Sequence, residues 1–348
     1  MVEQSPAPAT AAPVKRPRVS VVIPTYNRAD LVGHAIRSAL DQTMDDLEVI
    51  VVDDGSTDGT PDVLARFADP RVRVIHQANK GISSALNTGF RAAAGDAVIM
   101  LGSDDRFLPY CLARLVAALD AHPDAVLVYG RAQAMDDLAR PLPQITGNPE
   151  PFPGQTLRSI LYGDFVATIA ALTRRDALFA VGLCDERLSG NEDWDLWIRL
   201  ATRGPFVFVD TVLAQFRVHP TRFTAARGEA LAHLTQGRLA ILDKAFARPD
   251  LPPDARAVRP LAYRNAYIDA GLRWLAVGGR PQALDQFRRA LRYGNPLATL
   301  ARIVYLAVIY RFIGRFGLVR AVSDTVFRGR RALRSLWAKL RKKGRHTR

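Results

Sequence analysis

The segment Val-Val-Asp-Asp-Gly-Ser-Thr-Asp-Gly-Thr (51–60) joins the end of an apolar run to a cluster of polar residues. The run at residues 47–52 is typical of a buried strand. The Gly, Ser, Thr and Asp residues that follow it favour a turn and a helix cap. They also suit a binding role, in which one carboxylate accepts hydrogen bonds from a base or ribose and the turn brings backbone close to the ligand. Taken alone, the segment leaves both interpretations open.

Apolar runs of the same kind recur on both sides of this segment. Strands are expected at residues 19–23, 47–52, 72–76, 97–101 and 125–129, and helices at 30–40, 61–67, 82–94 and 111–121. Strands that alternate with helices of about ten residues indicate βαβ units and a parallel sheet. Ligands of such sheets bind beyond the carboxyl ends of the strands. The sequence places three polar loops at that rim, at 24–27, 53–56 and 102–105.

Two pairs of adjacent acids are candidates for chemistry. Asp104 and Asp105 follow the fourth strand, where two carboxylates favour a hard divalent cation, with a simple turn as the alternative. Glu192 and Asp193 open a helix, a place that the helix dipole favours for acids in any case. Because tryptophans also stand within residues 194–197, we expect a site wall there, with a carboxylate as general base toward an acceptor hydroxyl.

Five motifs occur in a fixed order. They are Val-Ser-Val-Val-Ile-Pro-Thr-Tyr-Asn-Arg (19–28), the segment at 51–60, Asn-Lys-Gly-Ile-Ser-Ser-Ala-Leu-Asn-Thr-Gly (79–89), Gly-Ser-Asp-Asp (102–105) and Asn-Glu-Asp-Trp-Asp-Leu-Trp (191–197). Together they closely resemble the family-2 glycosyltransferases with the GT-A fold, over roughly residues 18 to 222. The resemblance implies an α/β, Rossmann-like mixed sheet, and the residues beyond it add a helical C-terminal extension.

The resemblance implies a donor site for a nucleotide-diphosphate sugar. Pro24 and Tyr26 match the loop that holds the base, Asp54 matches the acid that pairs with the base, and Asp53 lies nearer the ribose. The remaining donor-binding residues are expected to be Lys80, Asn87 and, at the sugar or ribose, Asp104.

The resemblance also implies a metal and a base. Asp105 would bind Mn²⁺ or Mg²⁺, and Asp193 matches the catalytic base, with Glu192 as its neighbour. His219 resembles a histidine that reaches the diphosphate or the metal in some members, although a lone histidine of this kind is more often a surface residue.

Two positions depart from the family pattern. Many members read Leu-Asp-Ala/Ser-Asp-Asp at the fourth strand, whereas Gly102 replaces the first acid here, so metal binding depends on Asp104 and Asp105. The common Ala-Arg-Asn reads Ala-Leu-Asn at 85–87, which removes a basic side chain near the nucleotide. Lys80 is our candidate to replace that charge.

These features predict an inverting, metal-dependent transfer of a sugar to a glycan or lipid-linked acceptor. A dinucleotide-dependent oxidoreductase is disfavoured, because no G-x-G-x-x-G follows the strand at 19–23. A non-catalytic protein that binds a sugar nucleotide or a partner at a surface is the alternative that Gly102 keeps open.

The net charge of +14 is concentrated at one end of the chain. Residues 311–348 contain thirteen Lys and Arg but a single acid, Asp324, and an apolar face at 333–340 is typical of a helix lying in a membrane interface. A solvated helix is the alternative, and nucleic-acid binding is disfavoured because no recognition module is present. The apolar run at 303–310 is too short to span a bilayer.

The expected organisation has four parts. A flexible leader at 1–17 precedes the GT-A domain at 18–223, a helical region at 224–310 and the basic tail at 311–348. Two lone cysteines and the lack of a secretory signal indicate a cytoplasmic protein, peripheral on the inner face of the plasma membrane.

Overall fold

The computed structural model describes residues 16–188, 190–218 and 228–313. Their strands form one nine-stranded mixed sheet in the order β3-β2-β1-β4-β8-β6-β9-β5, with β7 paired to β6. The strands are β1 (Val19–Thr25), β2 (Leu47–Asp53), β3 (Val72–His76), β4 (Ala97–Met100), β5 (Arg106–Phe107), β6 (Leu127–Met135), β7 (Pro141–Thr146), β8 (Ala171–Arg174) and β9 (Phe206–Arg217).

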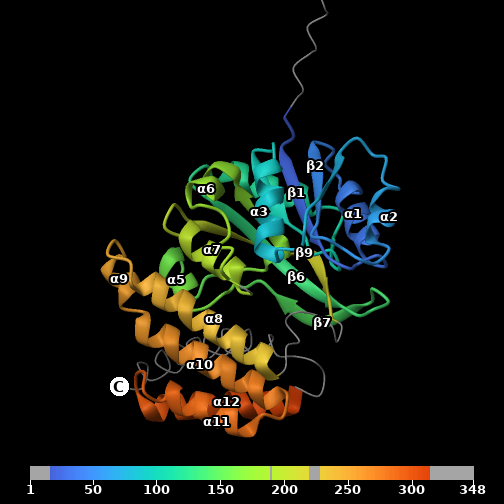
Figure 1. Ribbon diagram of the computed structural model, residues 1–348. Coiled ribbons are helices and arrows are strands. Elements are labelled where there is room, and N and C mark those ends of the chain that lie inside the picture. The colour runs from blue at the N-terminus through green and yellow to red at the C-terminus, as the bar shows by residue number, and fades with distance from the viewer. Residues whose placement is uncertain (1–15, 189, 219–227, 314–348) are drawn as a thin grey trace, which may run out of the picture.

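Helices cover both faces of the sheet, as the alternating pattern predicts (Figure 1). In the sheet-bearing part they are α1 (Val32–Leu40), α2 (Thr60–Leu64), α3 (Ile82–Ala92), α4 (Cys111–Ala121), α5 (Thr156–Tyr162), the 3₁₀ turn η1 (Thr168–Ala170), α6 (Arg175–Ala180) and α7 (Glu192–Leu200). The following helices are α8 (Gly228–Phe246), α9 (Pro253–Arg256), α10 (Arg259–Ala276), α11 (Arg280–Ala290) and α12 (Pro296–Ile313).

The central strands are apolar on both faces because each face is covered. In β1, Val21 and Ile23 pack with α1 and α4, whereas Val22 points to the opposite core, which includes α3, α7 and α8. Gly89 of α3 lets that helix approach closely, since a Cβ there would lie 2.3 Å from Cγ1 of Val22. The sheet and the first C-terminal helices therefore share one hydrophobic core.

The sheet departs from the purely parallel arrangement after β4. Strand β8 runs antiparallel to both β4 and β6, so that β6 and β9 again run in the direction of β4. The first residues of the Pro- and Gly-containing segment at 132–155 extend β6, and the segment also contains β7. The edge of a sheet tolerates such residues.

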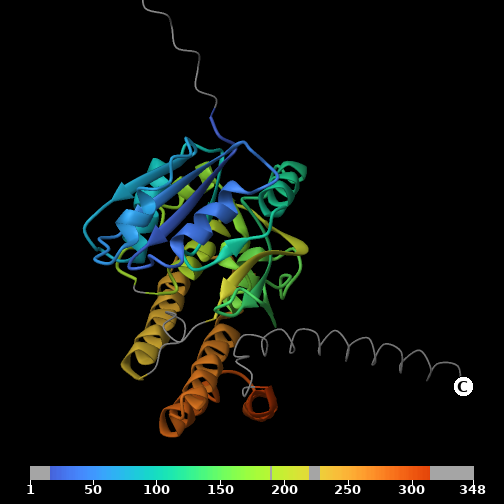
Figure 2. The ribbon, with the colours of Figure 1, turned by 90° about the vertical axis from the view of Figure 1, so that its right-hand side faces the viewer.

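The C-terminal helices form layers on one side of the sheet-bearing part, with α11 and α12 farthest from the sheet (Figure 1). Figure 2 shows α8 and α10 extending away from the sheet, with α12 beside α10. None of the described helices is long and apolar enough to cross a membrane. Residues 1–15 of the expected leader and 314–348 of the expected tail lie outside the described residues.

Candidate active site

The polar loops meet at one edge of the sheet, as their positions after parallel strands predict. Strands β2, β1 and β4 are neighbours in this order, and all three end there. The first two loops are hydrogen-bonded to each other, because the Asn27 backbone N–H donates to Oγ of Ser56 (2.9 Å) and the Thr57 N–H donates to Oδ1 of Asn27 (2.8 Å). Asn27 adopts a left-handed conformation, with φ of 51°, to make this link.

Asp53 and Asp54 are both buried at the end of β2. Oδ1 of Asp53 accepts the Ser56 N–H at 3.1 Å, and Oδ2 lies 2.9 Å from Nδ1 of His76, the last residue of β3. Both oxygens of Asp54 accept hydrogen bonds from the loop at 77–81. In this structure the Asp54 carboxylate therefore organises the loop before α3, and its pairing with a base stays a prediction.

The other expected donor-binding residues divide into exposed and buried groups. Pro24 is the penultimate residue of β1, and the exposed Tyr26 follows the end of that strand. Lys80 is exposed in the loop before α3. Asn87 is buried, where its amide nitrogen donates to the Cys184 carbonyl (3.0 Å) and its oxygen accepts the Cys184 N–H (2.9 Å). Asn87 thus holds α3 to the segment before α7, and its contact with the donor stays a prediction.

The side chains of Asp104 and Asp105 converge above Gly102. A Cβ at position 102 would lie 2.6 Å from Oδ2 of Asp105 and 3.1 Å from Oδ1 of Asp104. An acid at 102 would displace these carboxylates, so the departure from the family pattern makes room for the two acids that remain. Oδ1 of Asp105 also accepts the backbone N–H of Arg217 at the end of β9 (2.9 Å).

Asp193 lies at the same edge of the sheet as these acids. Its Oδ2 accepts a 2.6 Å hydrogen bond from the hydroxyl of Thr168, and its Oδ1 accepts the N–H of Trp194 at 2.8 Å. Thr168 begins η1, the 3₁₀ turn that leads directly into β8. Because β8 is antiparallel to β4, the start of β8 adjoins the carboxyl end of β4. Asp193 and the pair Asp104 and Asp105 therefore belong to one rim.

Glu192 has a different environment from its neighbour. Burial, reinforced by the negative charge of Asp193, raises the pKa of Glu192 to about 7. Its Oε2 is buried and has no hydrogen-bond partner in the described part of the chain. The Glu192 carboxyl is therefore partly protonated, and to that extent neutral, near pH 7.

The two tryptophans do not line the site, contrary to our expectation. Trp194 and Trp197 are buried in the core, and Nε1 of Trp194 donates to the carbonyl of Ile160 at 2.9 Å. Their helical spacing points them inward, so only the first residues of α7 face the rim. His219 lies outside the described residues, and its role stays a prediction.

A family model described as "Glycosyl transferase family 2" matches residues 20–179, which contain four of the five motifs. This region of the chain belongs to glycosyltransferase family 2. Succinoglycan biosynthesis protein ExoO of Rhizobium meliloti is 42% identical to the chain over 144 residues, which is 38% of this chain and 41% of that protein. The chain spans 29% to 66% of the length of the curated relatives considered.

Solved glycosyltransferases share the fold over most of the chain. TarS of S. aureus, residues 1–349 with UDP-GlcNAc, has a TM-score of 0.62 at 18% identity, covering 90% of this chain and 92% of that fragment. The mannosyltransferase PcManGT of Pyrobaculum calidifontis, with GDP-Man and Mn²⁺, has a TM-score of 0.57 at 23% identity, covering 97% and 92%. The mixed sheet of the family-2 region thus has the GT-A fold.

The candidate active site fits a divalent cation through two carboxylates. Within the residues that the structure describes, no group of three or more His, Cys, Asp or Glu side chains could hold a metal. The convergence of Asp104 and Asp105 above Gly102 does supply the hard oxygen ligands that Mn²⁺ and Mg²⁺ prefer. Phosphate oxygens of a donor would complete such a coordination shell.

Three residues that hydrogen-bond to the expected site residues were not identified from the sequence: His76, Thr168 and Arg217. His76 ends a strand of the same parallel set, so the rule that identified the other loops could also have identified it. Thr168 and Arg217 carry no local signal, because β8 and β9 bring them to the rim from distant parts of the chain.

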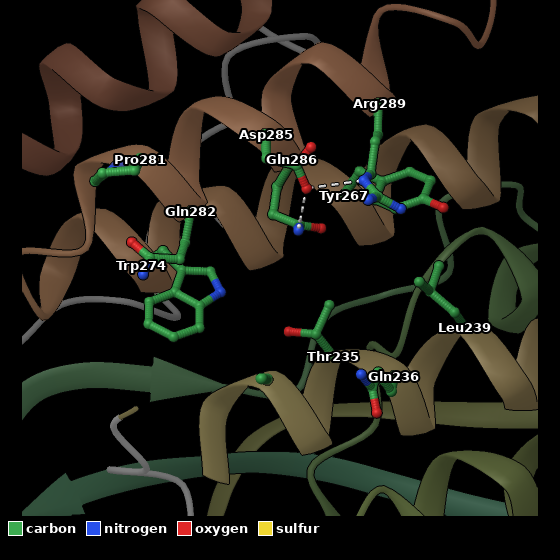
Figure 3. Close-up of a pocket in the computed structure, with 11 residues that line it drawn as sticks. Thr235, Gln236, Leu239, Tyr267, Trp274, Pro281, Gln282, Asp285, Gln286 and Arg289 are labelled. Atoms are coloured by element: carbon green, nitrogen blue, oxygen red, sulfur yellow. Dashed lines mark hydrogen bonds and ion pairs between the residues drawn. The ribbon is translucent and has the colours of Figure 1, made fainter. Parts of the chain in front are cut away.

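A cavity of about 450 Å³ lies outside the candidate active site, between α8, α10 and α11 (Figure 3). Its walls include Thr235, Tyr267 and Trp274 but none of the expected site residues. The opposite face of α8 approaches the site, where the carbonyl of Leu234 accepts a 3.3 Å hydrogen bond from the amide of Asn191. Helix α8 therefore separates this cavity from the start of α7.

Proposed function

We propose that the protein is an inverting glycosyltransferase that moves a sugar from a nucleotide-diphosphate donor to a hydroxyl group of a glycan or lipid-linked acceptor. The observation that carries this proposal is the placement of Asp193 and the Asp104–Asp105 pair at one rim of a GT-A sheet. The donors bound to TarS and PcManGT, UDP-GlcNAc and GDP-Man, support the donor class. The name of ExoO supports a role in polysaccharide synthesis.

Asp193 acts as the general base in this proposal. It removes the proton of the acceptor hydroxyl while that oxygen attacks the anomeric carbon, and the bond from this carbon to the diphosphate breaks on the opposite face. Thr168 and the Trp194 N–H fix the orientation of the carboxylate that receives the proton. Such a displacement inverts the anomeric configuration.

The donor is bound by the loops at the ends of β1, β2 and β3. The exposed Tyr26 ring packs against the base, and Asp53, held by Ser56 and His76, lies toward the ribose. Asp104 and Asp105 would hold a divalent cation, and the chemistry it would supply is neutralisation of charge on the diphosphate. The Asp54 contacts keep the loop at 77–81, with Lys80, beside the donor.

The test is Asp193→Asn in the full chain, after a thermal-shift screen of UDP- and GDP-sugars with Mn²⁺ and trials of acceptors. General-base assistance contributes about 10²- to 10⁴-fold, so turnover should fall by that factor while donor binding remains. Asp176→Asn is the matched control, since Asp176 also accepts the N–H of the next residue in the first turn of a helix (2.7 Å).

Two results would contradict the proposal. Wild-type turnover in Asp193→Asn would show that Asp193 is not the general base. Donor binding by the wild type without transfer or hydrolysis of any sugar nucleotide would favour the non-catalytic alternative, in which the rim only binds a sugar nucleotide.

The basic tail supports a location at the inner face of the plasma membrane. Its thirteen Lys and Arg would be attracted to anionic lipids, by about 1 kcal/mol for each basic residue near the surface. Flotation with vesicles that contain phosphatidylglycerol tests this, and the triple variant Arg330→Gln, Arg331→Gln, Arg334→Gln should weaken binding. Unchanged binding of that variant would exclude this part of the tail as the anchor.

A further inference from the structure

Helix α12 presents an apolar stripe to solvent. Leu297, Leu300, Val304 and Tyr305 are 78%, 48%, 54% and 48% exposed. Their spacing of three, four and one residues places them along one side of the helix. We call these four residues the α12 outer face. A stripe of this kind normally faces the interior of a protein.

The opposite side of α12 is apolar as well. Ile303 and Leu306 are buried against Ile268 and Leu272 of α10, and Thr299 is fully buried. The outer face is therefore not the core-facing side of an ordinary amphipathic helix. A surface helix in water carries charged or polar residues opposite its buried side, whereas the exposed residues at 297, 300, 304 and 305 of α12 are apolar.

Charged groups are absent from the described outer face. Between Pro296 and Ala307 the sequence contains one charged residue, Arg302, and no acid. The Arg302 guanidinium donates to the hydroxyl of Tyr162 at 3.1 Å, so it is directed toward the body of the protein. The outer face thus combines large apolar side chains with the lack of any charge that would be costly to transfer into an apolar environment.

The stretch of sequence that contains this face is strongly basic. Residues 280–348 contain eighteen Lys and Arg but only two acids, Asp285 and Asp324, while residues 1–279 contain thirty bases and thirty-two acids. An uncharged apolar stripe within a strongly basic stretch matches an anionic bilayer, which offers hydrocarbon beneath negative headgroups. A second copy of the same basic surface would be repelled.

We propose that the α12 outer face docks in the interface of an anionic membrane. The helix lies in the membrane plane, since no described helix is suited to crossing a bilayer. Leu297, Leu300 and Val304 enter the boundary between headgroups and acyl chains, and the basic residues contact the headgroups. In Figure 1, α12 belongs to the layer farthest from the sheet. This inference does not rest on the proposed sugar transfer.

A single labelled cysteine tests the docking directly. The chain has only two cysteines, Cys111 and Cys184, and both are buried. In Val304→Cys of the full chain, the new thiol is therefore the accessible one for an environment-sensitive NBD dye. Leu138→Cys is the matched control, because Leu138 is also an exposed apolar residue and lies in the turn between β6 and β7. The probe membrane is phosphatidylcholine vesicles with or without phosphatidylglycerol.

We expect NBD fluorescence at position 304 to rise with anionic vesicles and to be quenched by lipids labelled in the acyl chain. The label at position 138 should not respond. The double variant Leu300→Glu, Val304→Glu should lower the vesicle partition coefficient at least about tenfold, which is 1.4 kcal/mol. The loss should persist in 1 M salt, where the Debye length is about 3 Å, because it removes apolar insertion. Leu138→Glu should leave partition unchanged.

Each other outcome overturns the inference. Vesicle binding without a response at position 304 would mean that the basic tail alone makes the contact. A label at 304 that is shielded without vesicles, increasingly so at higher protein concentration, would assign the face to a second copy. Shielding that does not depend on concentration would assign it to another segment of the same chain. A wild-type protein that binds no vesicles would also refute it.

Discussion

The hydroxyl of Thr168, the first residue of the 3₁₀ turn that leads into β8, donates a 2.6 Å hydrogen bond to Oδ2 of Asp193. This contact joins the first turn of α7 to the sheet. It fixes one oxygen of the carboxylate, while the N–H of Trp194 contacts the other at 2.8 Å. In a general base, such contacts set the direction in which the proton is received.

Thr168→Val should therefore lower kcat about tenfold, because it removes a hydrogen bond to a charged group without changing the side-chain volume. The KM for the donor should stay near the wild-type value, since the Thr168 hydroxyl hydrogen-bonds to Asp193 rather than to an expected donor-binding residue. Thr168→Ser keeps the hydroxyl and should recover most of the lost kcat. Steady-state kinetics of the three proteins decide, and an equal loss in the Ser variant would show that Thr168 acts only through packing.

The raised pKa of Glu192 predicts a dependence of stability on pH. Its pKa of about 7 lies above the ordinary value of 4.5, so the folded protein binds the proton more tightly than the unfolded chain. This contribution to stability is complete below about pH 4.5 and is lost as the pH rises through about 7. Glu192→Gln, which stays neutral, should raise the Tm relative to wild type more at pH 8 than at pH 5. A constant difference in Tm would contradict the assignment.

The sequence predicted the parallel half of the fold well, because each buried strand there is apolar on both faces and is followed by an amphipathic helix. The same rule located Asp53, Asp54, Asp104 and Asp105 at one edge of the sheet. It failed after β4, where β8 pairs antiparallel between β4 and β6. No local pattern indicates which strand a four-residue apolar segment will join, so Thr168 could not be placed.

Solvent exposure was the other quantity that the sequence could not provide. Tryptophans beside two acids suggested a site wall, yet the turn of α7 directs Trp194 and Trp197 into the core. The residues of α12 read as an apolar run, and only the packing of Ile303 and Leu306 on α10 shows which side remains exposed. In both helices the tertiary contacts decide between two faces of similar composition.

Gly102→Ala tests the role of the space above Gly102. The added Cβ would lie 2.6 Å from Oδ2 of Asp105, so this carboxylate must move away from Asp104. We expect a weaker Mn²⁺ dependence of UDP or GDP binding, measured by calorimetry, with little change in Tm. Gly163→Ala is the control, because a Cβ there meets no atom within 4 Å. Unchanged binding in Gly102→Ala would mean that the two carboxylates do not hold the cation.

Asp54→Asn separates support of the loop at 77–81 from recognition of the base. The Asp54 carboxylate accepts hydrogen bonds from Nε2 of Gln77 (2.8 Å) and from the N–H groups of Lys80 (3.0 Å) and Gly81 (2.9 Å). An amide retains one acceptor oxygen and directs its NH₂ at a donor, so at least one of these N–H groups loses its partner. The free energy of unfolding in urea should fall by about 1–3 kcal/mol.

The exposed Asp30→Asn should change the unfolding free energy by less than about 0.5 kcal/mol, which makes it a suitable control. Nucleotide affinity measured on both variants then completes the test. Lower stability with unchanged UDP and GDP binding would show that Asp54 only holds the loop. Lower binding of one nucleotide but not the other would show that Asp54 also recognises the base, because loss of loop order alone weakens the binding of both nucleotides. Wild-type stability in Asp54→Asn would show that other contacts hold the loop before α3.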